Sequence, residues 1–305
     1  MTSLWSRRAV LTAACAGIAG AALTACGSGS VASAINPKRF VSVGDGFSDV
    51  GQTGRVFTVN DGSLLWTQQL ASYYNLTLTA ASAGGFSYAQ GHARVDSEDT
   101  TSGTNVPSIA SQITSVLNRT TLVDDDLVLV SGGMADIVNA VNTTGISAAS
   151  TDAVKAAGKK QAEQVRRLVE AGATHVVVAG VYNLGMSPWA IRQDLAQGVQ
   201  DLSVAFNDQL LIGVNDLGAT VLYIDPALFF NLIAGKPSGY PFDVVDTPVC
   251  TTPDATTCTT GTVLLGADYN RYLFADDLYF TPAAQRLFVN EDFLENAYTR
   301  LKQRW

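Results

Sequence analysis

The sequence predicts an α/β fold, a three-layer α/β/α sandwich in which helices cover both faces of a central parallel sheet. Short apolar runs rich in β-branched residues recur along the chain and are bounded by Gly, Asp or Thr, as buried parallel strands are. Amphipathic helical patterns alternate with these runs, which favours strands that all run in the same direction. The predicted strands are residues 41–43, 127–130, 176–181 and 221–224, and the predicted helices are residues 64–74, 107–118, 151–171 and 194–214.

The helix predicted at residues 151–171 shows the helical pattern in detail. Lys, Glu and Arg lie on one face, whereas Val165, Leu168 and Val169 lie on the other. Gly172 follows, and glycine is the commonest residue just beyond a helix C-terminus. The sequence G-V-N-D at residues 213–216 also follows a helical pattern, so we interpret it as a helix end.

Two turns are expected at the carboxyl ends of predicted strands. Residues 44–48 follow the strand at 41–43, and residues 132–133 follow the strand at 127–130. Ligands of open parallel sheets bind beyond the carboxyl ends of the strands, so we expect the two turns to share a cleft. We expect the first turn to lead into a helix that Ser48 caps.

Length and charge limit the classes of function. The 305 residues suffice for one large α/β domain, and no linker or shift in composition divides the chain after its N-terminus. We therefore predict a single domain at residues 37–305. The 27 acidic and 19 basic residues give a formal net charge of −8, which argues against nucleic acid as a partner.

The N-terminus reads as a secretory leader. Arg7 and Arg8 precede an apolar run that ends L-T-A-C, so residues 1–25 are predicted to be a signal peptide. The ending resembles a bacterial lipobox, in which Cys26 is lipidated and residues 26–36 form a tether. The alternative is an ordinary signal peptide with an incidental cysteine. Export through the twin-arginine or the general secretory route stays open.

A lipid on Cys26 would make a membrane the partner of this protein. Gly27 and Ser28 follow the cysteine in place of the aspartate that often retains lipoproteins at the inner membrane. We therefore expect an exported lipoprotein of the cell envelope, with the outer membrane favoured.

Two cysteines remain in the predicted mature domain. Cys250 and Cys258 flank a polar loop, and in an exported chain this pattern favours a disulfide over two free thiols. Two cysteines without nearby histidines are a poor ligand set, so we expect no metal site, and the sequence implies no cofactor.

Four blocks carry the functional signal. Residues 40–51 read F-V-S-V-G-D-G-F-S-D-V-G, 84–94 read G-G-F-S-Y-A-Q-G-H-A-R, 133–136 read G-M-A-D, and 276–285 read D-D-L-Y-F-T-P-A-A-Q. They resemble the blocks of the SGNH, or GDSL, esterases and lipases, usually written G-D-S-L-S-D-x-G, G-G-x-N-Y-A-x-G-G-A-R, G-x-N-D and D-D-x-H-P-T-x-A-A-H. The resemblance covers nearly all of the mature chain. It implies an SGNH-hydrolase-like (flavodoxin-like) sandwich and chemistry on ester bonds.

The same resemblance shows three substitutions at catalytic positions. Gly46 replaces the serine nucleophile, Ala135 replaces the asparagine that faces the oxyanion, and Tyr279 replaces the histidine base. Gly91 matches a glycine whose N–H stabilises the oxyanion, and Asp276 matches the triad acid. A serine esterase needs a nucleophile and a base, and tyrosine, with a pKa of about 10, is a poor base near neutral pH. We therefore expect a catalytically defective homologue that binds an acyl, lipid or glycan ligand.

Two other functions stay open. An active ester hydrolase or acyltransferase would need a relocated nucleophile, and His92 is the histidine best placed to serve one, with Ser87, Ser82 or Ser48 as its partner. His175 opens a predicted strand and is expected at the opposite end of the sheet. The third function is that of a structural surface lipoprotein whose cleft is vestigial.

Overall fold

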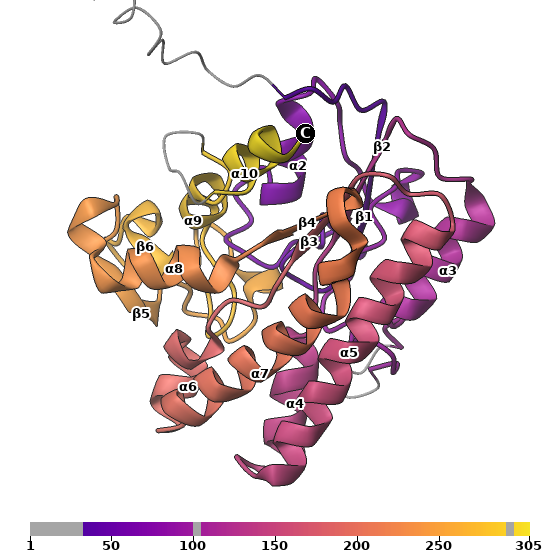
Figure 1. Cartoon of the computed structure of the whole chain (residues 1–305). Helices are drawn as coiled ribbons and strands as arrows, with labels where there is room; N and C mark the ends of the chain where they lie inside the picture. The colour runs from indigo at the N-terminus through magenta and orange to yellow at the C-terminus, as the bar shows by residue number, and fades with distance from the viewer. Residues whose placement is uncertain (1–32, 100–104, 291–295) are drawn as a thin grey trace, which may run out of the picture. The chain divides into compact units, whose positions relative to one another are not determined.

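The computed structural model describes residues 33–99, 105–290 and 296–305 (Figure 1). The described residues belong to one compact unit. The predicted leader, the lipidation site Cys26 and most of the predicted tether therefore lie outside the described residues. No helix in the described part of the chain is both long and apolar enough to span a bilayer.

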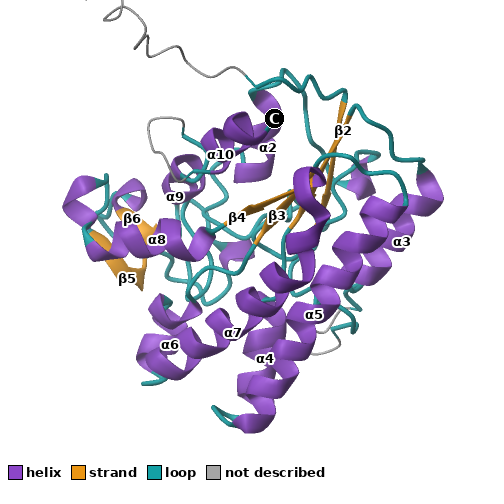
Figure 2. Ribbon diagram, viewed as in Figure 1, coloured by secondary structure: helices purple, strands orange, loops and turns teal. Residues whose placement is uncertain are grey.

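Four parallel strands form the central sheet, as the sequence predicts. They are β1 (Arg39–Val43), β2 (Asp126–Val130), β3 (Val176–Ala179) and β4 (Val221–Ile224), paired in that order. Nearly all of their side chains are buried, which explains their near-continuous apolar sequences. Figure 2 shows these strands at the centre, with a separate small sheet of β5 (Val244–Pro248) and β6 (Tyr272–Phe274).

The order in which the chain adds strands to the sheet reverses at β1. Ser87 forms an isolated parallel bridge with Ser42 of β1, so the segment around Ser87 flanks β1 on the side opposite to β2. The chain thus adds a partner on one side of β1 and then continues to β2 on the other. This is a topological switch point, where the carboxyl ends of two neighbouring strands leave a crevice for a ligand.

Helices cover both faces of the sheet, which confirms the predicted fold class. In Figure 1, α3, α4, α5 and α7 lie on one side of the sheet, and α2, α9 and α10 lie on the other. The helices are α2 (Trp66–Ser72), α3 (Ile109–Arg119), α4 (Met134–Thr144), α5 (Ala148–Glu170), α6 (Pro188–Arg192), α7 (Ala196–Val214), α8 (Pro226–Gly235), α9 (Pro282–Leu287) and α10 (Ala297–Arg304).

The four predicted helices correspond to α2, α3, α5 and α7. Gly172 follows the end of α5 with φ at 104°, a conformation that favours glycine. The G-V-N-D sequence at 213–216 is the end of α7, in agreement with its interpretation as a helix end. The strand predicted at 176–181 is shorter, because β3 ends at Ala179.

The helix expected directly after residues 44–48 is absent, so the capping role predicted for Ser48 is wrong. The described chain has no helix between this turn and α2, which begins at Trp66. The Ser48 hydroxyl instead lies 2.7 Å from that of Ser131, in the loop after β2. Both serines are buried, so their hydrogen bond joins the two turns that follow β1 and β2.

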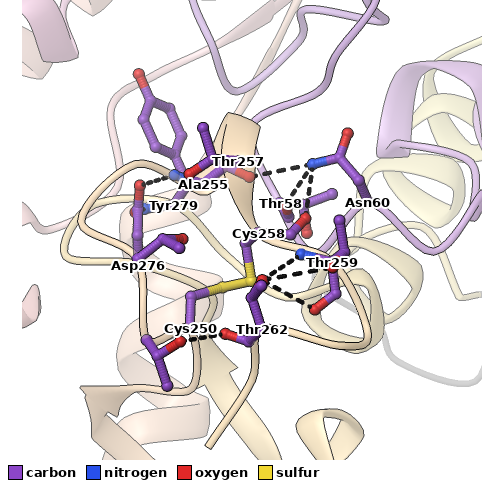
Figure 3. Close-up of a disulfide and its surroundings, with 12 residues drawn as sticks. Thr58, Asn60, Cys250, Ala255, Thr257, Cys258, Thr259, Thr262, Asp276 and Tyr279 are labelled. Carbon is purple, nitrogen blue, oxygen red and sulfur yellow. Dashed lines mark hydrogen bonds between the residues drawn. A yellow bond between two sulfur atoms is a disulfide. The ribbon is translucent and has the colours of Figure 1, made fainter.

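The predicted disulfide between Cys250 and Cys258 is present (Figure 3). It closes the loop that follows β5, and both sulfur-bearing residues are buried beside Val59, Val249 and Ala275. The loop packs against the segment before α2, because the Asn60 amide donates hydrogen bonds to the carbonyls of two of its residues.

Candidate functional site

A pocket of about 210 Å³ lies beside the start of α4, just beyond the carboxyl end of β2. It brings together His92, Ala135 and Tyr279, three of the positions that the sequence singles out. The full lining is His92, Arg94, Asp99, Met134, Ala135, Val138, Asn139, Asn142, Thr143, Leu278 and Tyr279. Gly46, Gly91 and Asp276 do not line it.

The two turns meet as expected, but the space between them is closed. Residues of both turns line a second cavity of only about 10 Å³, roughly the minimum for a single water molecule. Gly44 packs so closely on Ser131 that a side chain at residue 44 would overlap it. The open pocket is therefore displaced toward α4, away from the turn that holds Gly46.

Tyr279 fills the space in which a side chain of residue 46 would lie. A Cβ atom added to Gly46 would come within 2.6 Å of both Cε1 and the hydroxyl oxygen of Tyr279. The tyrosine is only 8% exposed, and its ring packs against Phe57 at 4.7 Å between centroids. Residue 46, which the sequence motif predicts to match a nucleophile, thus has no reactive group, and the space for a side chain there is occupied.

The tyrosine hydroxyl cannot serve as a base in this environment. Burial, followed by the nearby carboxylates of Asp45 and Asp276, holds the pKa of Tyr279 well above its usual value. The phenol therefore keeps its proton at physiological pH and can donate a hydrogen bond. Its oxygen lies beside Gly46, 2.6 Å from the position that a Cβ atom of residue 46 would take.

Asp276 holds the backbone of Tyr279 rather than orienting a base (Figure 3). One carboxylate oxygen accepts hydrogen bonds from the N–H groups of Leu278 and Tyr279, at 2.9 and 2.7 Å. The other accepts one from the N–H of Ala255, at 2.9 Å, inside the disulfide loop. Burial raises the pKa of this carboxyl to about 6, although these hydrogen bonds oppose the rise.

The disulfide loop therefore supports the wall of the pocket through Asp276. Replacing both Cys250 and Cys258 by serine is expected to lower the free energy of unfolding by about 2–3 kcal/mol, because the cross-link of a short loop restricts the unfolded chain. Urea unfolding of the variant beside the oxidised wild type measures this loss. Wild-type protein treated with a reductant under the same conditions is the control and should unfold at the variant's midpoint.

The expected oxyanion donors are not free. The N–H of Gly91 donates to the Asp49 carboxylate at 2.8 Å, and the other oxygen of Asp49 accepts from Gly51 and Gln52. Ala135 presents only a methyl group to the pocket. Neither of the two positions thus offers a hydrogen-bond donor to a developing negative charge. Stabilisation of that charge by such donors is a large part of the catalytic power of esterases.

The structure does not join His92 to Ser87. His92 is exposed at the pocket, with φ at 65° and its ring 5.4 Å from that of Phe57, and its imidazole forms no hydrogen bond to a described residue. Ser87 is completely buried at the edge of the sheet and does not line the pocket. His175 lies directly before β3, at the opposite end of the sheet from the pocket, as expected.

Two further buried aspartates lie near the site. Burial raises the pKa of Asp45 and of Asp136 to about 6 each, against hydrogen bonds from backbone N–H groups that lower it. Among the residues that the structure describes, no group of three or more His, Cys, Asp or Glu is arranged to hold a metal ion.

Sequence reasoning missed most of the pocket's polar lining. Arg94 belongs to a matching block, but the block alone gives it no role, and Asn139 and Asn142 lie on α4, a helix that the sequence pattern did not predict. The spacing of three between the two asparagines, which places them on one helix face, is the signal that could have paired them.

Comparisons with known proteins give limited information. No family model matches the sequence, and no curated protein matches it. Among solved structures, the chain is similar to phospholipase A1 from Streptomyces albidoflavus NA297, with 16% sequence identity, a TM-score of 0.37, and coverage of 87% of this chain and 97% of that one. The chain's own parallel sheet and the helices on both of its faces define the fold class.

Proposed function

We propose that this protein is an esterase- or lipase-like α/β domain that has lost ester hydrolysis and binds an acyl, lipid or glycan ligand. The observation that carries the proposal is the Tyr279 ring, which fills the space of a side chain at Gly46. In a serine hydrolase, loss of the nucleophile alone costs on the order of 10⁶ in kcat. Here the position also has no room for a replacement.

The pocket beside this closed position supports binding. Its wall combines apolar side chains, among them Met134, Val138 and Leu278, with the amides of Asn139 and Asn142. Ligand sites commonly combine a mostly apolar lining with a few polar groups that fix orientation. We further propose that a lipid on Cys26 anchors the domain to a membrane of the cell envelope, with the outer membrane favoured.

Hydrolysis of p-nitrophenyl acetate and butyrate tests the loss of catalysis. The protein from Gly27 onward is expected to show no turnover above the buffer rate. A Gly46→Ser/Ala135→Asn/Tyr279→His variant restores the three family residues together and removes the ring that blocks residue 46. It is expected to exceed the wild-type rate by at least about 10²-fold, the scale of one oxyanion donor.

A matched variant with Gly46→Ala in place of Gly46→Ser supplies the control. It carries the same change at residues 135 and 279 but no nucleophile, so it should stay at the buffer rate. Turnover by the wild type that disappears in His92→Ala would overturn the proposal and reveal an ester hydrolase with a relocated site. Absence of thermal stabilisation by any acyl, lipid or glycan compound would favour a structural lipoprotein.

A further inference from the structure

Arg94 brings a positive charge to the pocket that is only partly compensated. The side chain is 28% exposed, and its Nε lies 3.5 Å from the nearer carboxylate oxygen of Asp136. That nitrogen is buried and forms no hydrogen bond within the described part of the chain. The ion pair is thus a loose one, and the planar guanidinium keeps donors for another acceptor.

Asp136 is held by the backbone as well as by Arg94. Its second carboxylate oxygen accepts a hydrogen bond from the N–H of Val95 at 3.0 Å. Its pKa of about 6, raised by burial, means that it carries less than a full negative charge on the acid side of neutrality. Moving the Asp136 carboxylate into hydrogen-bond distance of the Arg94 guanidinium would break the buried hydrogen bond from Val95.

The pocket offers further donors and one opposing charge. The side-chain amides of Asn139 and Asn142 line the pocket and form no hydrogen bonds to residues that the structure describes. Asp99 also lines the pocket, where it is buried and has an interaction of its own. An anion must therefore gain more from Arg94 and the neutral donors than it loses to Asp99 and to Asp136, the partner of the guanidinium.

We propose that this pocket binds a short straight-chain monocarboxylate. The carboxylate pairs with the guanidinium of Arg94, whose fork matches its two oxygens, and the alkyl chain lies on Met134, Val138 and Leu278. This inference rests on the proposed binding function and names its ligand.

The size of the pocket favours a small ligand. Its volume of about 210 Å³ is below the roughly 300–1,000 Å³ of common small-molecule sites. The alkyl chain of the carboxylate is therefore expected to be short.

Binding of sodium hexanoate to the wild-type protein at pH 7.5, measured by calorimetry, tests the inference beside two neutral probes, hexan-1-ol and glucose. Hexanoate is expected to bind at least about tenfold more tightly than hexan-1-ol, since a hydrogen bond between two charged groups is stronger than one from a neutral hydroxyl. Arg94→Gln should abolish this preference and leave hexan-1-ol binding unchanged. Arg271→Gln, which removes an arginine from an exposed pair with Asp243, should have no effect.

A second pair of variants guards against misfolding of Arg94→Gln. Asp99→Asn removes the opposing charge and should tighten hexanoate binding only, whereas Val138→Trp fills the pocket and should weaken every probe. Equal affinity for hexanoate and hexan-1-ol, or a preference that survives Arg94→Gln, would overturn the carboxylate assignment but leave ligand binding intact. Binding of glucose alone would likewise overturn the carboxylate assignment and leave ligand binding intact. Binding of none of the probes, together with ester turnover by the wild type, would overturn the proposed function as well.

Discussion

Gly46→Ser is expected to destabilise the folded protein by about 1–3 kcal/mol, the usual cost of inserting atoms into a packed site. The added Cβ would lie 2.6–2.7 Å from three atoms of the Tyr279 side chain, two ring carbons and the hydroxyl oxygen, well inside van der Waals contact. The backbone at residue 46 does not adopt a positive φ, so a serine there is not strained by its own conformation. The whole cost therefore arises from the ring.

A double-mutant cycle with Tyr279→Ala isolates that cost. Tyr279→Ala alone is expected to destabilise by about 3–5 kcal/mol, because it leaves a cavity beside Phe57. In that background Gly46→Ser has room and should cost little or even stabilise, giving a coupling energy of about 1–3 kcal/mol between the two sites. Urea unfolding of the four proteins measures it.

Gly235→Ser is the matched control for this cycle. No atom lies within 4 Å of the position that a Cβ would take at Gly235, and this glycine too lacks a positive φ. Its effect should be within about 0.5 kcal/mol and equal in both backgrounds. An equal cost for Gly46→Ser with and without the tyrosine ring would contradict the packing described here.

The folded protein is expected to be more stable at mildly acidic pH than at neutral pH. Burial raises the pKa of Asp45, Asp136 and Asp276 from 3.8 to about 6. A carboxyl with a raised pKa binds its proton more tightly in the folded state, so its stabilising contribution is full below about pH 4 and is lost as the pH rises to about 6. Each shift corresponds to at most about 3 kcal/mol.

Free energies of unfolding at pH 4.5, 5.5 and 7.5 measure this dependence. The total should fall by a few kcal/mol across the range, less than the sum of three separate shifts because Asp45 and Asp136 interact. Asp45→Asn removes one buried charge and should both flatten the curve and raise stability at pH 7.5. Asp216→Asn, at an exposed carboxyl paired with Arg166, should not flatten it, and a curve that rises with pH would contradict the assignment.

The strands were predictable because their signal is local. Each of the four runs of β-branched residues is buried on both faces of the sheet, so its sequence is apolar without interruption. The helices that were missed lack that clarity. In α8 (Pro226–Gly235) apolar residues occur on every side, so it lacks the single apolar face that marks an amphipathic helix. The helix α4 does have a buried face, formed by Met134, Ile137 and Val141, but it begins directly after Gly133, where a turn alone was expected.

The site was predictable in its residues but not in its contacts. The motifs identify Gly46 and Tyr279 as substituted positions, yet the distance between them depends on segments more than 200 residues apart in the chain. Similarly, the hydroxyl of Ser48 forms a hydrogen bond with that of Ser131 instead of capping a helix. Its partner comes from the loop after β2, which the local sequence does not reveal. The packing of the Tyr279 ring on Gly46 is a tertiary contact that no local pattern contains.

The fit between the Tyr279 ring and Gly46 also constrains the order of evolutionary change. In any lineage where residue 46 was once a serine, a tyrosine at residue 279 could pack as it does now only after the serine was replaced by glycine. The reverse change is costly in either order, because a serine at residue 46 meets the tyrosine ring and a smaller residue at 279 leaves a cavity. The two residues therefore have to change together, and a serine at residue 46 alone would not create a hydrolytic site.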